Sequence, residues 1–182
     1  MRRILSIFVA LSALFLTLLV PIGSAGATPS YCGLTWGSLD KSDPDHSTAT
    51  LTNVRTGRQD CYDRMVVDLA GPVAGYRAGY VDQVYMDASG APVSLRGSAF
   101  LQVVIFAPAY DNSGNLTYNP GNRNELTNVG GYDTFRQLAW AGTFEGQTTI
   151  GLGVRARLPF RVLTLDGPGS GSRIVIDVAH RW

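Results

Sequence analysis

The segment "TTIGLGVRA" (148–156) determines how the rest of the chain is interpreted. Gly151 and Gly153 belong to a G-x-G-x-x-A pattern, which cradles a pyrophosphate when a helix follows at once, because the helix N-terminus supplies the N–H donors. Here Pro159 would stop a helix within two turns, and "FRVLTL" (160–165) alternates like a strand. We therefore expect a strand, on which the two glycines share one face and permit a close approach or a bulge, and no nucleotide site.

The other periodic segments also repeat every two residues. They are rich in Val, Ile, Thr and aromatic residues, and clusters of Gly, Pro, Asn and Asp separate them. Eight strands are predicted in this way, over residues 48–55, 61–70, 76–86, 98–107, 134–144, 148–154, 160–166 and 172–179. This count and spacing indicate an all-β protein, either a β-sandwich or a barrel.

Three regions add detail to this pattern. Residues 144–147 (Phe-Glu-Gly-Gln) predict a hairpin turn, and on the returning strand Thr149 shares the glycine face while alternate residues from Ile150 point to the core. The polar connection 107–124 is long enough to be either mobile or functional. The best candidate for a short helix is 122–129.

An internal repeat links two of the predicted strands. The stretch that begins Arg64-Met-Val-Val-Asp68 reappears as Arg173-Ile-Val-Ile-Asp177. If the two strands were antiparallel neighbours in matching register, Arg64 would face Asp177 and Asp68 would face Arg173. We prefer this structural pairing to a ligand site as the explanation for the four charged residues on these strands. The repeat also hints at a duplicated, pseudo-symmetric architecture.

The N-terminus resembles an export signal. A basic start precedes an apolar run from Ile4 to Val20, and Ala25-Gly26-Ala27 gives the small-x-small pattern of a signal peptidase site, so residues 1–27 are expected to be a signal peptide cleaved after Ala27. The alternative is an uncleaved membrane anchor, because the run is close to spanning length. No cysteine lies at the expected cleavage site, so we expect no lipid anchor.

The exported part is nearly neutral and holds both cysteines. Without Arg2 and Arg3 it carries 13 basic and 14 acidic residues, which gives no electrostatic footprint for nucleic acid or an anionic membrane. In an oxidising compartment, the simplest expectation is that Cys32 and Cys61 form a disulfide. This bond would tether an N-terminal leader, residues 28–59, in which one strand is expected. Metal ligation is the alternative, but no His cluster accompanies the two cysteines.

A search for catalytic groups gives little. The two histidines, His46 and His180, are far apart in sequence, and no G-x-S-x-G motif appears. The only glutamates are Glu125 and Glu145, and nothing in the sequence places a second acid near either, as a glycosidase would require. We therefore expect no enzyme, no cofactor and no metal.

Four blocks in fixed order carry a family resemblance: "CYDRMVVDLAGPVAGYRAGYVDQV", "GSAFLQVVI", "GTFEGQTTIGLGVRARLPFRVLTLDGP" and "SRIVIDV". From about Asp60 to Val178 the chain resembles the AMIN-like domain of secreted proteins and lipoproteins of actinobacteria, so the domain is expected over 60–182. That domain is similar to the AMIN domain preceding the catalytic domain of some N-acetylmuramoyl-L-alanine amidases, where it targets peptidoglycan. The resemblance implies a β-sandwich of two sheets with no chemistry of its own.

Two functional hypotheses follow. The first is an exported, non-catalytic cell-envelope module, secreted or in the cell wall, that binds cell-wall polysaccharide such as peptidoglycan, or an envelope protein. Aromatic rings stack on sugars and Arg forks bind carboxylates, although each such residue also suits a core or solvated role. The candidate contacts are Tyr110, Tyr118 and Tyr132 around the long connection, and Glu145, Arg155 and Arg157, which are expected near the hairpin. The second hypothesis is a small secreted hydrolase of cell-wall glycan that uses Glu145 or Asp acids.

Overall fold

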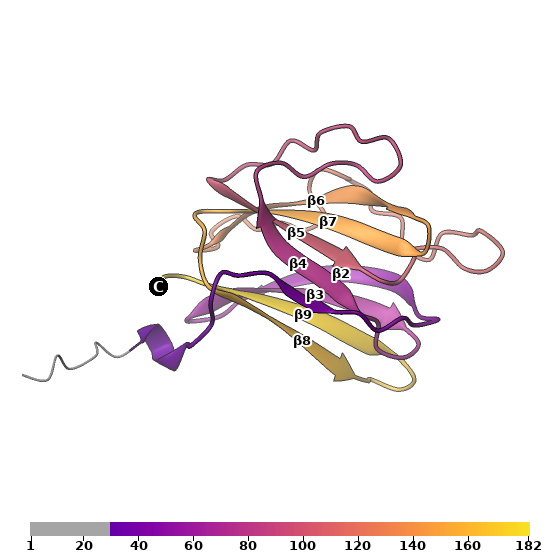
Figure 1. Cartoon of the computed structure of the whole chain (residues 1–182), viewed down its shortest axis with the longest axis horizontal. Coiled ribbons are helices and arrows are strands. Elements are labelled where there is room, and N and C mark those ends of the chain that lie inside the picture. The colour runs from indigo at the N-terminus through magenta and orange to yellow at the C-terminus, as the bar shows by residue number, and fades with distance from the viewer. Residues whose placement is uncertain (1–29) are drawn as a thin grey trace, which may run out of the picture.

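The computed structural model describes residues 30–182, which form two antiparallel β-sheets packed face to face (Figure 1). The expected signal peptide and its cleavage site after Ala27 lie outside the described residues. One 3-10 turn, η1, precedes nine strands. The bounds are η1 Tyr31–Gly33, β1 Lys41–Asp43, β2 Thr50–Arg58, β3 Tyr62–Ala70, β4 Tyr76–Val81, β5 Ala99–Ile105, β6 Phe135–Phe144, β7 Gln147–Val154, β8 Phe160–Asp166 and β9 Ser172–Ala179.

The two sheets confirm the predicted all-β sandwich. One has five strands in the order β1-β4-β5-β7-β6, and the other has four in the order β2-β3-β9-β8. Period-two alternation puts every second side chain between the sheets, so Met65 and Val67 of β3 and Ile150 and Leu152 of β7 are fully buried. The eight predicted strands are present as β2 to β9.

Two local expectations were wrong. The leader 28–59 holds two strands, β1 and β2, which pair with β4 and β3, so the boundary expected at residue 60 falls between hydrogen-bonded neighbours. The three residues of β1 are too few and too polar to show a period. The segment 122–129 is not helical, because its backbone runs along the edge of β6 instead: Leu126 N–H donates to the Leu138 carbonyl at 2.9 Å, and the Arg123 carbonyl accepts from β6.

The internal repeat lies on neighbouring strands of one sheet. Strands β3 and β9 have the predicted register, in which Arg64 pairs with Asp177 and Asp68 with Arg173. Arg64 donates two hydrogen bonds to the fully buried carboxylate of Asp177, at 2.7 and 2.9 Å. Asp68 instead accepts two hydrogen bonds from Arg55 of β2. The repeat thus reflects cross-strand pairing within one sheet, since the two sheets differ in strand number and order.

The glycine face of β7 supports a second layer. Residues 82–97, here called the flap, leave β4 and lie over the outer face of β7 (Figure 1). At Gly153 an added Cβ would lie 1.9 Å from the carbonyl oxygen of Arg96, so only glycine permits this approach. Thr149 shares that face and donates a hydrogen bond to Asp87 of the flap at 3.0 Å. Burial raises the pKa of the Asp87 carboxyl above its usual value.

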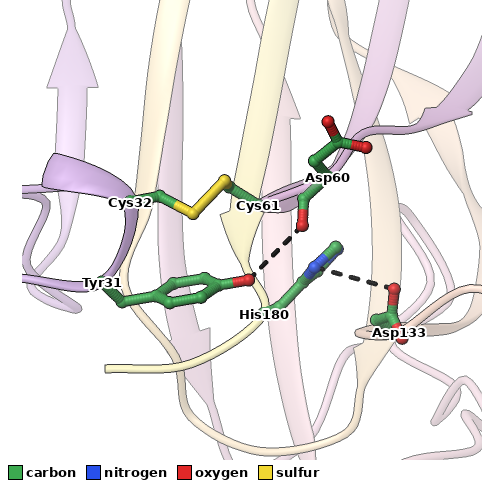
Figure 2. Close-up of a disulfide and its surroundings, with 6 residues drawn as sticks. All are labelled: Tyr31, Cys32, Asp60, Cys61, Asp133 and His180. Atoms are coloured by element: carbon green, nitrogen blue, oxygen red, sulfur yellow. Dashed lines mark hydrogen bonds and ion pairs between the residues drawn. A yellow bond between two sulfur atoms is a disulfide. The ribbon is translucent and has the colours of Figure 1, made fainter.

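The cysteines form the expected disulfide, which ties η1 to the start of β3. Figure 2 shows Cys32 bonded to Cys61, with the Tyr31 hydroxyl donating to the Asp60 carbonyl beside it at 3.4 Å. His180, the residue after β9, donates its backbone N–H to the Cys61 carbonyl at 3.0 Å. The disulfide therefore fixes the leader against the end of the four-stranded sheet.

Removing the disulfide is expected to lower the free energy of unfolding by about 3 kcal/mol, because the bond closes a loop across a sequence separation of 29 residues and so restricts the unfolded chain. The measurement is urea unfolding of Cys32→Ser/Cys61→Ser beside the oxidised wild type. A midpoint that stays unchanged, with the same slope, would contradict this role of the bond.

Candidate functional site

The six candidate contact residues do not gather in one place. Tyr132, Arg155 and Arg157 lie where β6 begins and β7 ends, and we call this the arginine-rich end. Tyr110 and Glu145 lie at the β6–β7 turn, the hairpin end, which is separated from the first by the eight residues of β7, roughly 26 Å. The ring of Tyr118 packs against Trp140, with ring centroids 5.4 Å apart, as a partly buried side chain beside the core.

The hairpin end has the predicted turn. Glu145 and Gly146 adopt φ of +49° and +81°, as a two-residue type I′ turn requires, and the Tyr110 hydroxyl accepts a hydrogen bond from Gly146 N–H at 3.1 Å. Beside the turn lies a cavity of about 400 Å³, lined in part by Glu145, His46 and Phe106. The last two rings stack on each other, 5.5 Å apart.

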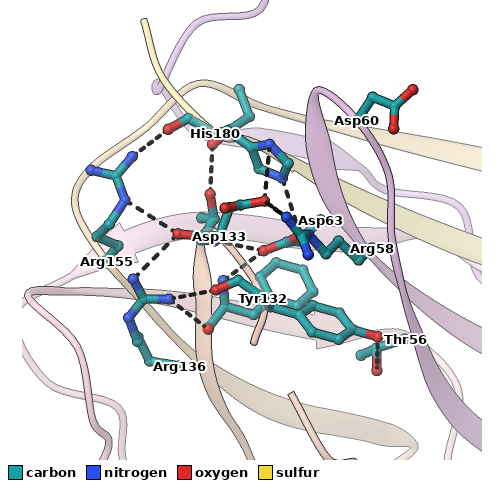
Figure 3. Close-up of polar contacts among 12 residues, drawn as sticks. Thr56, Arg58, Asp60, Asp63, Tyr132, Asp133, Arg136, Arg155 and His180 are labelled. Carbon is teal, nitrogen blue, oxygen red and sulfur yellow. Dashed lines mark hydrogen bonds and ion pairs between the residues drawn. The ribbon is translucent and has the colours of Figure 1, made fainter. Parts of the chain in front are cut away.

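The arginine-rich end is built around one histidine (Figure 3). The His180 Nε2 atom lies 3.1 Å from Oδ1 of Asp63, and Nδ1 lies 3.6 Å from Oδ2 of Asp133. Asp63 is fully buried, and its Oδ2 accepts backbone N–H bonds from Thr134 at 2.6 Å and Phe135 at 2.9 Å. Thus the Asp63 carboxylate anchors the start of β6, and the His180 imidazole connects this carboxylate to the end of β9.

The alternation of side chains along β3 and β9 explains why Asp63 and His180 point inward. Asp63 is on the same face of β3 as Met65, and His180 continues the inward-facing series of β9 that includes Ile176 and Val178. Both polar side chains therefore point into the sandwich just where its apolar core ends. A buried carboxylate needs partners there, since an unpaired one costs several kcal/mol.

Arginines hold the loop before β6. Arg58 donates to Oδ2 of Asp133 at 2.9 Å. Arg136 donates to the carbonyls of Tyr132, Asp133 and Phe135, and Arg155 donates to those of Asp133 and His180. The ring of Tyr132 stacks on Phe135, and its hydroxyl donates to the Thr56 hydroxyl at 3.3 Å. Tyr132 is therefore a packing residue as much as a surface one.

Cations without carboxylate partners surround this cluster. Arg157 donates to the backbone and hydroxyl of Ser38 and lies over the Tyr80 ring, and Arg181 lies over the Tyr31 ring at 4.5 Å. Trp182, 67% exposed, donates its indole N–H to the Arg157 carbonyl. In residues 30–182 no acidic side chain lies within 4 Å of the guanidinium groups of Arg136, Arg155, Arg157 and Arg181.

The polar side chains of this cluster already have partners within the protein. Both ring nitrogens of His180 face carboxylates, so neither is free to activate a hydroxyl, and the nearby Thr134 hydroxyl donates to the Ala179 carbonyl. Asp63, Asp133 and His180 are also close enough together to be considered as metal ligands. However, Asp63 Oδ2 is used by backbone donors, and Arg58 holds the Asp133 oxygen. The geometry suits a rigid, positively charged surface better than a reaction centre.

Comparison with known proteins gives one match. The family model for the AMIN-like domain matches residues 49–180, from the residue before β2 to the histidine of the cluster. No curated protein and no solved structure matches the chain significantly. Within residues 30–182 no helix is long and apolar enough to cross a membrane. AMIN-like domains are cell-envelope-related modules that generally bind and do not catalyse. The match covers most of the sequence, and the chain therefore belongs to the AMIN-like domain family.

Proposed function

We propose that this protein is an exported, non-catalytic module that binds peptidoglycan or another cell-envelope component through its arginine-rich end. The observation that carries the proposal is the group of exposed guanidiniums without acidic partners, among them Arg155 and Arg157, beside the exposed indole of Trp182. Arg forks bind planar carboxylates, and aromatic rings stack on sugars. Peptidoglycan offers both chemistries, since its sugars carry lactyl groups and carboxylate-bearing peptides.

The positions of the two glutamates do not fit a catalytic pair for glycan hydrolysis. Asp63 and Asp133 do lie close together, but backbone N–H groups and Arg58 already occupy their oxygens. Glu125 lies beside the middle of β6 and pairs with Arg96, whereas Glu145 is at the hairpin end, roughly 20 Å further along the strand. A glycosidase needs its two carboxyl groups within about 10 Å of each other. Glu145→Gln separates the two functions, since it would abolish a hydrolase that uses this acid and leave binding through the other end unchanged.

Co-sedimentation of the purified protein with cell-wall sacculi tests the proposal. We expect saturable pelleting that persists at about 0.1 M salt and weakens as salt screens the arginines further. Arg157→Gln is expected to weaken the apparent affinity about threefold to tenfold. A protein that stays in the supernatant at every salt concentration would contradict peptidoglycan binding.

Arg77→Gln is the matched control. Arg77 is also exposed and lies over an aromatic ring, that of Phe106 at 5.7 Å, but it is the second residue of β4, near the hairpin end. Both substitutions remove one positive charge and one cation–π contact. If Arg77→Gln weakens pelleting as much as Arg157→Gln, the attraction depends on total charge and the arginine-rich end has no special role.

A further inference from the structure

A large cavity lies beside the flap, away from the His180 cluster. It measures about 640 Å³, within the range of small-molecule sites. One wall is the flap from Met86 to Arg96, and the other is the segment around Arg123 that runs along the edge of β6. Gln137 and Trp140 of β6 also line this groove.

The groove is held open by a buried amide. Gln137 is 5% exposed, and its Oε1 accepts the backbone N–H of Arg96 at 2.7 Å. Its Nε2 donates to the carbonyl of Asn124 at 2.8 Å, in the opposite wall. An ion pair between Arg96 and Glu125 also joins the two walls. These contacts fix the separation of the walls before any ligand arrives, so little ordering is needed on binding.

The charges of the groove are unbalanced. Arg96 is neutralised by Glu125, whose hydrogen bonds raise the pKa of the guanidinium above its usual value. Arg123 is exposed, and its side chain makes no hydrogen bond or ion pair with any residue from 30 to 182. One positive charge is left at the mouth, next to an apolar surface that includes Met86, Leu95 and Trp140.

We propose that this groove binds a small ligand in which a free carboxylate lies beside apolar groups. The carboxylate would pair with Arg123, whose planar fork matches two oxygens, and the apolar groups of the ligand would cover Leu95 and Met86. A peptide C-terminus and an acidic sugar both supply this chemistry. The inference rests on the proposed envelope function only for the choice of probes.

Calorimetric titration tests the groove with defined probes. N-acetyl-D-alanyl-D-alanine is compared with its C-terminal amide, and N-acetylmuramic acid with N-acetylglucosamine, which lacks the carboxylate. For the wild type we expect at least one carboxylate probe to bind about tenfold or more tightly than its neutral partner. The pair that shows the difference identifies the carboxylate source. Equal affinities within both pairs, or no binding of any probe, would overturn the inference.

Arg123→Gln supplies the second readout. Since the Arg123 side chain makes no hydrogen bond or ion pair in the described chain, the variant should melt like the wild type, but the preference for the carboxylate should fall to less than about twofold. The Arg77→Gln variant should keep the wild-type preference for the carboxylate probe. A preference that survives in Arg123→Gln would place the carboxylate elsewhere. If the probes fail while sacculi still pellet the protein, the groove inference is wrong and the proposed function stands; if pelleting fails too, both are wrong.

Discussion

Replacing Asp63 with alanine is expected to lower the free energy of unfolding by about 4 kcal/mol. The change leaves the N–H groups of Thr134 and Phe135 buried without an acceptor and removes the partner of His180 Nε2. Each buried donor without an acceptor costs about 1–3 kcal/mol, and a lost charged partner adds to this. Urea unfolding, monitored by circular dichroism, measures the loss through the shift in midpoint.

Asp60→Ala is the matched control for that measurement. Asp60 is exposed, and its carboxylate makes no hydrogen bond with the described residues, so its removal should change stability by less than about 0.5 kcal/mol. A loss below about 1 kcal/mol in Asp63→Ala would contradict the account. It would mean that the start of β6 does not depend on this carboxylate.

Gly153→Ala is expected to lower the free energy of unfolding by about 3 kcal/mol, or to detach the flap. The new Cβ would lie 1.9 Å from the Arg96 carbonyl oxygen, and a backbone carbonyl moves only if the flap lifts. Lifting exposes the small apolar cluster that includes Val84 and Val93. Urea unfolding gives the loss, and hydrogen exchange of the flap amides shows whether it has detached.

Gly151→Ala separates this steric effect from a general effect of adding a methyl group to β7. Its Cβ would meet Leu95 Cδ1 at 3.0 Å and Val84 Cγ1 at 3.2 Å, which are ends of side chains that adjust by a few tenths of an ångström. We expect a change below about 1 kcal/mol. Equal losses in the two variants would show that the close approach of Arg96 is not the cause.

Periodicity was sufficient to predict the strands, and it left a sandwich or a barrel open until the family resemblance favoured the sandwich. The pairing of Arg64 with Asp177 was predictable because the internal repeat gives both strands the same spacing of Arg and Asp, so that antiparallel neighbours in matching register bring opposite charges together. The glycine face of β7 was predictable from the alternation of side chains along a strand. The short strand β1 was not, because three polar residues carry no period and pair with β4 only through tertiary structure.

The candidate site was harder to predict. Glu145 and Arg155 were both expected near the hairpin, and this was wrong for Arg155, which follows β7 at the opposite end of that strand. A usable signal was nevertheless present. The alternation that places Met65 and Val178 in the core also places Asp63 and His180 on the inward faces of neighbouring strands, where two buried ionisable groups require each other. Asp133, in a loop without a period, gave no such signal.

The proposed function requires that the arginine-rich end contact the cell envelope. Hydrogen exchange of the protein, free and bound to sacculi, tests it most directly because it reports which backbone segments the wall covers. We expect slower exchange in residues 132–136, 155–157 and 180–182 on binding, with no change at 144–147. Slower exchange confined to the hairpin end, or none anywhere in a protein that has pelleted, would contradict it.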